Sequence, residues 1–222
     1  IDSISQSWAV ISGAGDNDKK YISMESLENH LVDKADGIIK LLDPPFEKSK
    51  LNPGYIKSYV SGTRENGGQY THGAIWVIIA MALLNLDDKA FEYYKMINPI
   101  EHSRTREAAS KYKVEPYVVA ADVYGKYNLA GRGGSSSWMY IAGIKYILGL
   151  DIENGMMKIT PHIPANWEGY SIRYKYGESL YNIKVTKKHL EKKVVIINGK
   201  VSEHEEIALD SSGQIYNVEI TI

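Results

Sequence analysis

The chain of 222 residues contains no cysteine, which excludes disulfide bonds and thiolate zinc sites. The absence of disulfides fits a reducing compartment, and we expect the protein to act in the cytoplasm. The formal net charge is only -1. No strong overall field would therefore draw the chain to nucleic acid or to an anionic membrane surface.

Long hydrophobic runs are also lacking, since the apolar stretch from Ala74 to Leu84 is too short to span a bilayer. This stretch is hydrophobic on every side, which is typical of a helix enclosed within a larger protein. Phenylalanine is scarce, with two residues against 17 tyrosines and four tryptophans. Aromatic rings with a polar group suit sugar-binding surfaces, although they also fill protein cores.

Hydrophobic periodicity divides the chain near residue 150 into a helical part and a β part. We therefore expect an α+β fold with a helical domain over residues 1–150 and a β domain over residues 151–222. The expected helices are 23–42 with Ser23 as N-cap, 73–84, 88–97, 103–112, 116–124 and 137–148 with Gly149 as C-cap.

After Asp151 the hydrophobic period changes to two, which is typical of a small antiparallel β-sandwich. The expected strands are 157–160, 170–176, 180–185, 194–197 and 215–220, with turns at Asn154-Gly155, Gly177-Glu178 and Asn198-Gly199.

Two further segments bear on the organisation of the chain. Residues 1–11 begin without methionine and already read as a helix, so we expect the chain to be a piece of a longer polypeptide. Residues 43–63 carry proline, glycine and asparagine and predict a long loop, and such loops are usually functional or disordered.

The most informative run is Arg64-Glu65-Asn66-Gly67-Gly68-Gln69-Tyr70-Thr71-His72, directly before the apolar stretch. It offers a guanidinium, a carboxylate, two amides, two hydroxyls and an imidazole around a glycine pair. These groups suit a polyhydroxylated or anionic ligand. A polar loop at the end of a buried helix is a place where a rigid scaffold presents a site.

Each candidate also has a purely structural interpretation. His72 could be a histidine at a helix N-terminus that bonds to the backbone, although an anion is favoured at the same place. Glu65 could simply form a salt bridge with Arg64 or with another cation. The run Gly131–Ser137 could be a flexible connector or a phosphate-binding nest before a helix. The remaining histidines show no metal-ligand spacing, so we expect no metal site.

Several runs together resemble a known family. Arg64–His72, Val114–Ala120 and Trp138–Gly143 are followed by Ile147–Leu150 and Lys158–Pro164. This order resembles the C-terminal part of inverting glycoside phosphorylases of the cellobiose/chitobiose phosphorylase family, glycoside hydrolase family 94. The first run looks closer to the branch of β-1,2-glucan phosphorylases and cyclic β-1,2-glucan synthases. The resemblance covers essentially the whole chain and implies the later helices of an (α/α)6 barrel followed by a C-terminal β domain.

The chemistry implied by this resemblance is phosphorolysis of a β-glucosidic bond with inversion, which gives α-glucose 1-phosphate. Phosphate attacks the anomeric carbon while a carboxylic acid protonates the leaving oxygen, as in an inverting glycosidase with phosphate in place of water. The parent protein would be a hexosyltransferase that acts on a β-glucan oligosaccharide or disaccharide. Inorganic phosphate would be its co-substrate, with no other cofactor, and a homodimer would form through parts outside this chain.

The resemblance also implies roles for particular residues. Arg64, Glu65 and Gln69 would contact the sugar, and His72 would bind phosphate. The residues expected to cradle the phosphate together with His72 are Gly133, Gly134 and Ser135.

Three features depart from the family pattern. The family's general acid is an aspartate upstream of Ile1, and no residue here matches it, so we expect the chain alone to be inactive. The glycine loop before Trp138 is shorter than in related sequences. Ala121 stands where the family has glutamine.

Two other functions remain open at this stage. A hydrolase on the same barrel would need a second carboxylate that activates water, for which Glu65 is the candidate. A non-catalytic carbohydrate-binding module would bind sugar without turnover.

Overall fold

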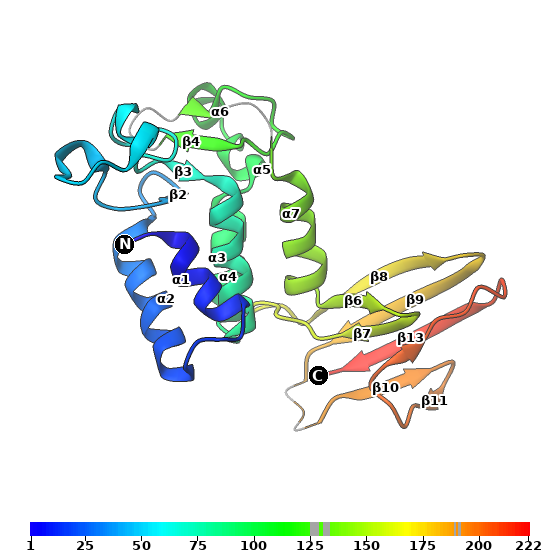
Figure 1. Ribbon diagram of the computed structural model, residues 1–222. Coiled ribbons are helices and arrows are strands. Elements are labelled where there is room, and N and C mark those ends of the chain that lie inside the picture. Colours follow the sequence, from blue (N-terminus) through cyan, green and yellow to red (C-terminus); the bar gives the residue numbers. More distant parts are fainter. Residues whose placement is uncertain (125–128, 131–133, 189, 191) are drawn as a thin grey trace. The chain divides into compact units, whose positions relative to one another are not determined.

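The structure is a computed structural model that describes residues 1–124, 129–130, 134–188, 190 and 192–222 (Figure 1). The chain divides into two compact units, Ile1–Gly143 and Ile144–Ile222, and each is described by itself. In the part of the chain that is described, no helix is both long enough and apolar enough to cross a lipid bilayer.

The first unit is mainly helical. Its helices are α1 (Ser3–Ile11), α2 (Asn17–Leu31), α3 (Thr71–Leu83), α4 (Asp87–Met96), α5 (Pro99–His102), α6 (Arg106–Tyr112) and α7 (Ser136–Ile141). The last continues as a π-helix, η3 (Ala142–Ile147), which extends past the end of this unit at Gly143. Two 3₁₀ turns, η1 (Phe46–Lys48) and η2 (Gly54–Ser58), lie within the long 43–63 segment. The short strands are β1 (Val32–Asp33), β2 (Ile38–Ile39), β3 (Gln69–Tyr70), β4 (Asp122–Tyr124) and β5 (Leu129–Ala130).

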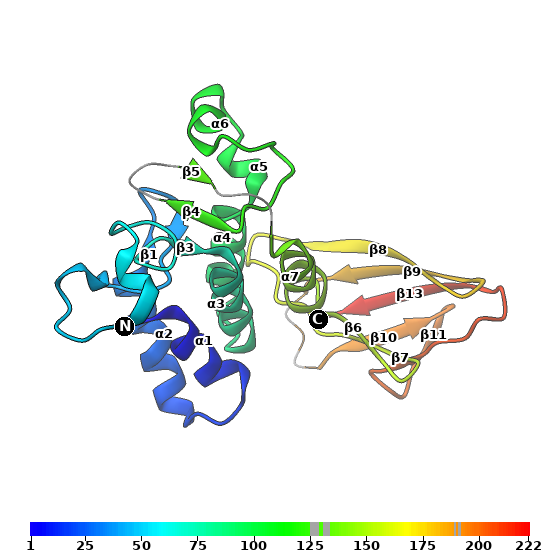
Figure 2. The same cartoon turned by 45° about the horizontal axis from the view of Figure 1, so that its top comes forward.

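Helix α3 is the centre of this unit. Ten of its 13 residues are buried, and α1 and α4 pack beside it (Figures 1 and 2). This confirms the enclosed helix that the apolar run predicts, because a helix without a polar face is stable only when it is covered all round. The helix expected at 88–97 is confirmed as α4.

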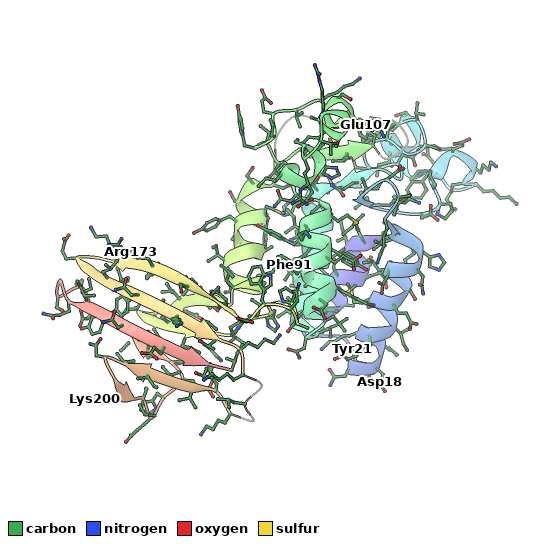
Figure 3. The ribbon with its side chains drawn as sticks, turned by 180° about the vertical axis from the view of Figure 1, so that it is seen from behind. Asp18, Tyr21, Phe91, Glu107, Arg173 and Lys200 are labelled. Atoms are coloured by element: carbon green, nitrogen blue, oxygen red, sulfur yellow. The ribbon has the colours of Figure 1, made fainter. Side chains whose placement is uncertain are left out.

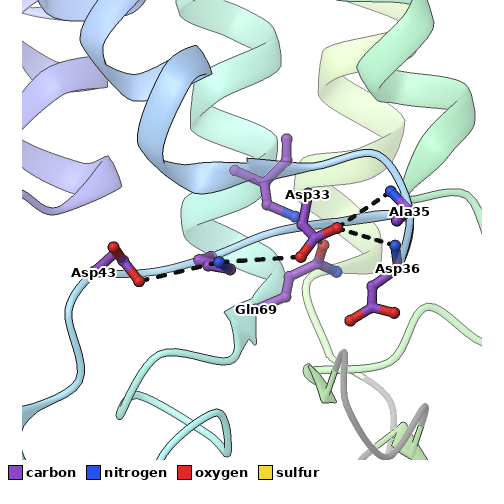
Figure 4. Close-up of polar contacts among 7 residues, drawn as sticks. Asp33, Ala35, Asp36, Asp43 and Gln69 are labelled. Atoms are coloured by element: carbon purple, nitrogen blue, oxygen red, sulfur yellow. Dashed lines mark hydrogen bonds and ion pairs between the residues drawn. The ribbon is translucent and has the colours of Figure 1, made fainter.

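The helix predicted over 23–42 is wrong in its position and its end. Helix α2 begins at Asn17, with Asp16 as N-cap, and ends at Leu31. Beyond it, β1 and β2 form a hairpin in which the Asp33 carboxylate accepts hydrogen bonds from the N–H groups of Ala35 and Asp36, both at 3.1 Å (Figure 4). An aspartate that bonds the backbone two and three residues ahead favours a turn over a helix.

The helix predicted over 116–124 is also wrong. Residues Asp122–Tyr124 form strand β4, which pairs with β3 on one side and β5 on the other. The Tyr112 hydroxyl donates to the Val118 carbonyl at 3.0 Å and accepts from the Ala120 N–H at 3.3 Å. These bonds take up backbone groups that a helix would need, so tertiary contacts override the local helical pattern.

The other two expected helices are confirmed with changed ends. The helix expected over 103–112 begins at Arg106 after the Thr105 N-cap, and α5 is a separate turn before it. The helix expected over 137–148 is α7 together with its π-helical continuation η3.

The second unit contains β6 (Leu150–Glu153), β7 (Met156–Ile159), β8 (Gly169–Tyr176), β9 (Ser179–Thr186), β10 (Val194–Ile197), β11 (Lys200–Val201), β12 (Ile207–Ala208) and β13 (Ile215–Thr221). They form a five-stranded sheet, ordered β11-β10-β13-β9-β8, and a three-stranded sheet, ordered β12-β7-β6. Met157 and Ile207 from the smaller sheet share one core with Tyr181, Val195 and Val218 from the larger. All five predicted strands and the sandwich-like packing are therefore present.

One part of the β prediction needs correction. Strands β9 and β13 are paired in parallel, Leu180 with Ile215 through Thr186 with Thr221, so the larger sheet is not wholly antiparallel. The turns Asn154-Gly155 and Asn198-Gly199 have positive φ at both residues, as two-residue hairpin turns require.

Candidate functional site

The Arg64–His72 loop is fixed to the preceding long segment by a buried amide. The side chain of Asn66 is fully buried. Its Oδ1 accepts from the Phe46 N–H at 2.8 Å, and its Nδ2 donates to the Tyr59 carbonyl at 2.8 Å. Asn66 therefore holds the 43–63 segment against the loop that carries the candidate site.

The glycine pair lets the loop turn back tightly. Gly67 has φ +92°, and a Cβ there would lie 2.8 Å from Pro45 Cγ. A Cβ on Gly68 would lie 2.8 Å from the Arg64 carbonyl oxygen. Arg64 itself has φ +46°, a left-handed backbone conformation that residues other than glycine rarely adopt. Such conformations persist only where the surroundings hold them, and they are frequent at functional sites.

Gln69, which the resemblance assigns to sugar contact, does not face solvent. Its side chain is fully buried beside the β1–β2 hairpin (Figure 4). The Oε1 atom accepts from the Ile39 N–H at 3.0 Å, and Nε2 donates to Thr71 Oγ1 at 3.1 Å. Gln69 therefore joins the hairpin to the start of α3.

The alternation of strand side chains separates this buried face from an open one. In the β3–β4 ladder Gln69 lies opposite Val123, and both are buried. Tyr70 lies opposite Asp122, and both are half-exposed. Because successive strand residues point to opposite faces, Tyr70, Asp122 and Tyr124 share the open face.

Arg64 and Glu65 add charge to this open face. Arg64 Nε lies 3.8 Å from Glu65 Oε2, and the guanidinium lies 4.9 Å from the centre of the Tyr59 ring. Asp122 and Tyr124 are also within electrostatic range of the guanidinium. The Oε2 atom of Glu65 is buried and has no hydrogen-bond partner among the described residues. Burial raises the pKa of Asp122; Arg64 opposes this shift and the Glu65 charge adds to it.

His72 lies in a group of aromatic rings at the N-terminus of α3. Its ring centre is 4.5 Å from that of Trp76, 5.5 Å from that of Trp138 and 6.0 Å from that of Tyr70. Its Nε2 is buried, with no hydrogen-bond partner in the described part of the chain. Burial lowers the pKa of His72, so the imidazole is neutral near pH 7 and offers one N–H donor.

The segment before α7 lies next to the same helix end. The Ala121 carbonyl accepts from the Thr71 N–H at 2.9 Å, and the Val119 carbonyl accepts from the Gly134 N–H at 2.9 Å. Ser135 has φ +62° and is the N-cap residue of α7. The structure thus brings Gly134 and Ser135 to the segment that contacts α3, while Gly133 lies outside the described residues.

The sequence motif does not include Asp122, Tyr124, Tyr59 or the tryptophan neighbours of His72. The local pattern predicts a helix at Asp122, and only the pairing with β3 places it beside Arg64. The tryptophans stand at helical spacing after His72 and in α7, but their meeting depends on how the two helices pack.

A cavity of about 760 Å³ lies along the 43–63 segment, apart from these residues. Its lining includes Ile1, Leu42 and Phe46, but none of Arg64, Glu65 and His72. Arg64, Glu65 and His72 therefore lie outside this cavity. Among the described residues, no three His, Asp or Glu side chains are grouped so that they could hold a metal ion.

Comparisons with known proteins agree with the resemblance seen in the sequence. Residues 1–149 match the catalytic domain of the Glycosyl hydrolase 94 superfamily, and residues 150–199 match the C-terminal domain of Glycosyl hydrolase family 65.

Individual proteins with similar sequences include a glucan synthase and two phosphorylases. Cyclic β-(1,2)-glucan synthase NdvB of Rhizobium meliloti is 41% identical over 94% of this chain, which corresponds to 8% of that protein. Solabiose phosphorylase of Paenibacillus borealis is 28% identical over 97% of the chain and 29% of its own length. N,N'-diacetylchitobiose phosphorylase of Vibrio proteolyticus is 26% identical over 88% of the chain and 25% of its own length. The chain thus spans less than a third of each of these relatives, and its match over residues 1–149 shows that it belongs to the glycosyl hydrolase 94 superfamily.

Proposed function

We propose that the polypeptide containing this chain phosphorolyses a β-glucosidic bond with inversion and releases α-glucose 1-phosphate. Membership of the glycosyl hydrolase 94 superfamily and the phosphorylases among the relatives support the proposal. One structural observation carries it. A single face joins the charged groups Arg64, Glu65 and Asp122 to the imidazole of His72 through Tyr70, which pairs with Asp122 and lies near His72.

The charged end of this face suits a sugar. Carboxylate oxygens accept hydrogen bonds from sugar hydroxyls, and a guanidinium donates to their oxygens. Arg64 and Glu65 lie close enough to bind neighbouring hydroxyls of one ring. The rings of Tyr59 and Tyr124 lie near the guanidinium and offer apolar surface for a pyranose.

The other end suits a phosphate. Helix α3 has 13 residues, and no described side chain caps its N-terminus, although the Ala121 carbonyl takes the Thr71 N–H. The free N–H groups and the dipole of a helix N-terminus favour an anion. His72 would add its N–H as a neutral donor. Ser135 follows Gly134, whose N–H bonds the Val119 carbonyl in the segment that contacts the same helix end through Ala121. The attacking phosphate would then approach a sugar held by Arg64 and Glu65.

Protonation of the leaving oxygen requires an acid from elsewhere in the polypeptide. We therefore propose that residues 1–143 supply the later helices of an (α/α)6 barrel, whose earlier part carries the acid. Without that acid the leaving group is unassisted, and the 222-residue chain alone should show no turnover. The relative with 41% identity favours a β-1,2-linked glucan as the substrate.

The experiment is an assay of the full-length polypeptide with short β-1,2-glucans, with and without inorganic phosphate. Phosphate-dependent release of α-glucose 1-phosphate, with its anomeric form read by NMR, supports inverting phosphorolysis. Release of free glucose regardless of phosphate identifies a hydrolase, and sugar binding without turnover identifies a binding module.

Two arginine variants provide a matched comparison for this assay. Arg64→Ala should abolish product release. Arg104→Ala should leave it unchanged, because Arg104 is exposed and pairs only with Glu101 three residues before it among the described residues. Equal activity of the two variants would contradict the proposed site.

A further inference from the structure

Asp122 is not part of the Arg64–His72 motif, yet the fold brings its carboxylate next to Arg64 and Tyr70 of that motif. It lies on β4, opposite Tyr70 on β3, and shares the open face with Tyr124. The neighbouring residue Ala121 offers no polar side chain to a ligand, and its backbone is already in use. The Ala121 carbonyl bonds the Thr71 N–H, and its methyl group lies 3.1 Å from where a Cβ on Gly134 would stand.

Asp122 and Glu65 share one guanidinium. Arg64 is within electrostatic range of both carboxylates, and its approach to Glu65 at 3.8 Å is too long for a hydrogen bond. Counted over the described residues alone, two carboxylates and one arginine leave a net negative charge on this half-buried surface. A simple ion pair would need only one carboxylate, so stabilisation by pairing does not account for the second.

Oxygen atoms of these two carboxylates lack hydrogen-bond donors among the described residues. Among the described residues, no side chain donates a hydrogen bond to the Asp122 carboxylate. The Glu65 Oε2 atom is buried and likewise lacks a donor in the described part of the chain. Partly burying a carboxylate without donors is unfavourable, and a ligand rich in hydroxyl donors would relieve the cost.

We propose that Asp122 binds the sugar directly, accepting hydrogen bonds from hydroxyls of a glucose unit that Arg64 and Glu65 also hold. This inference rests on the proposed function and adds to it a residue that determines sugar affinity. Arg64 donates to the hydroxyl oxygens, and the two carboxylates accept from the hydroxyl hydrogens. Tyr70 connects this position to His72, so the sugar lies next to the phosphate site.

Kinetics of the full-length polypeptide test the assignment. Asp122→Asn and Asp122→Ala should raise the KM for the glucan by about tenfold or more, the range for a hydrogen bond to a charged group. The KM for phosphate should stay within about twofold, because phosphate binds at the other end of the face. The control is Asp18→Asn, which removes the same charge from an exposed position on α2 (Figure 3) and should change neither constant.

Deoxy substrates separate direct contact from a structural role. Glucans that lack one hydroxyl of the bound glucose at a time are compared with wild type and Asp122→Ala. At the contacted hydroxyl, wild type should lose about tenfold in kcat/KM, and Asp122→Ala should lose nothing further. Equal losses in both proteins at every position would overturn the proposal, as would equal increases in the KM values for glucan and phosphate.

A binding measurement keeps this result independent of the proposed reaction. If wild type releases no glucose 1-phosphate, the proposed function fails, and calorimetric titration with the same glucan still tests Asp122. Weaker binding by Asp122→Asn than by wild type and Asp18→Asn supports the assignment. Equal binding by all three proteins, or no binding by wild type, overturns it.

Discussion

Gln69 offers the sharpest test of how the site loop is held. Its side chain bonds the Ile39 N–H and Thr71 Oγ1, and all three residues are buried. Gln69→Ala leaves the Ile39 N–H without an acceptor, which costs about 1–3 kcal/mol. Loss of the second hydrogen bond adds about 1 kcal/mol, and the one lost methylene, Cγ, adds about 0.8 kcal/mol. We expect a local destabilisation of about 3–5 kcal/mol.

Hydrogen exchange with mass spectrometry measures this effect in the full-length polypeptide. The peptide that contains Ile39 should lose protection by a factor of roughly 100 or more, since each 1.4 kcal/mol corresponds to a factor of ten. Gln6→Ala removes the same amide from a partly exposed position on α1 and should leave this peptide unchanged.

The outcome that refutes the reasoning is unchanged protection around Ile39 in Gln69→Ala. If such a variant also raised the glucan KM, Gln69 would contact the sugar, contrary to its buried position.

Three further predictions concern the phosphate site, the response to pH and a glycine. His72→Asn should raise the KM for phosphate by about tenfold while the KM for glucan changes by less than about twofold, and equal effects in steady-state kinetics would exclude the assigned role. Burial lowers the pKa of His102, with Glu101 opposing the shift, so only the unfolded state takes up a proton just below its ordinary pKa of about 6.5. The stability from this neutral histidine is therefore fully present above that pH and falls as the pH drops through it. In His102→Gln the urea midpoint of unfolding should depend less on pH between pH 7.5 and 5.5. A pH dependence equal to that of wild type would contradict this. Gly149→Ala should cost at least about 3 kcal/mol in thermal or urea unfolding, because a Cβ there would lie 2.1 Å from the Thr160 carbonyl. Gly199→Ala, with φ +79° and no atom within 4 Å of its Cβ, should cost only about 1–2 kcal/mol, and equal costs would refute the steric argument.

Elements with strong local signals could be predicted from the sequence. Helix α3 follows from a run without polar residues, and the hairpins at Asn154-Gly155 and Asn198-Gly199 follow from residues that tolerate positive φ. The helix predicted over 23–42 shows the limit of this reasoning. Its apolar spacing continues past Leu31, but the Asp33 carboxylate bonds the local backbone and turns the chain into a hairpin.

The remaining differences come from pairing over long separations. Strand β4 depends on its ladder with β3, about 50 residues earlier, and the parallel pairing of β9 with β13 joins segments separated by other strands. The candidate site was predicted only in part for the same reason. Arg64, Glu65 and His72 stand in one run, whereas Asp122 and Trp138 reach them only through strand register and helix packing.

The motif itself divides into two kinds of polar residue. Asn66 and Gln69 are fully buried and make four side-chain hydrogen bonds, which tie the loop to Phe46, Tyr59, Ile39 and Thr71. Arg64 is exposed, and neither Glu65 Oε2 nor His72 Nε2 has a hydrogen-bond partner among the residues that the structure describes. At about 1 kcal/mol each, the four bonds are comparable to the cost of about 1–3 kcal/mol for a left-handed Arg64. The buried amides can therefore hold the arginine in an unfavourable backbone conformation before any ligand arrives. A site arranged in advance loses less conformational entropy on binding, which favours the affinity of a flexible glucan.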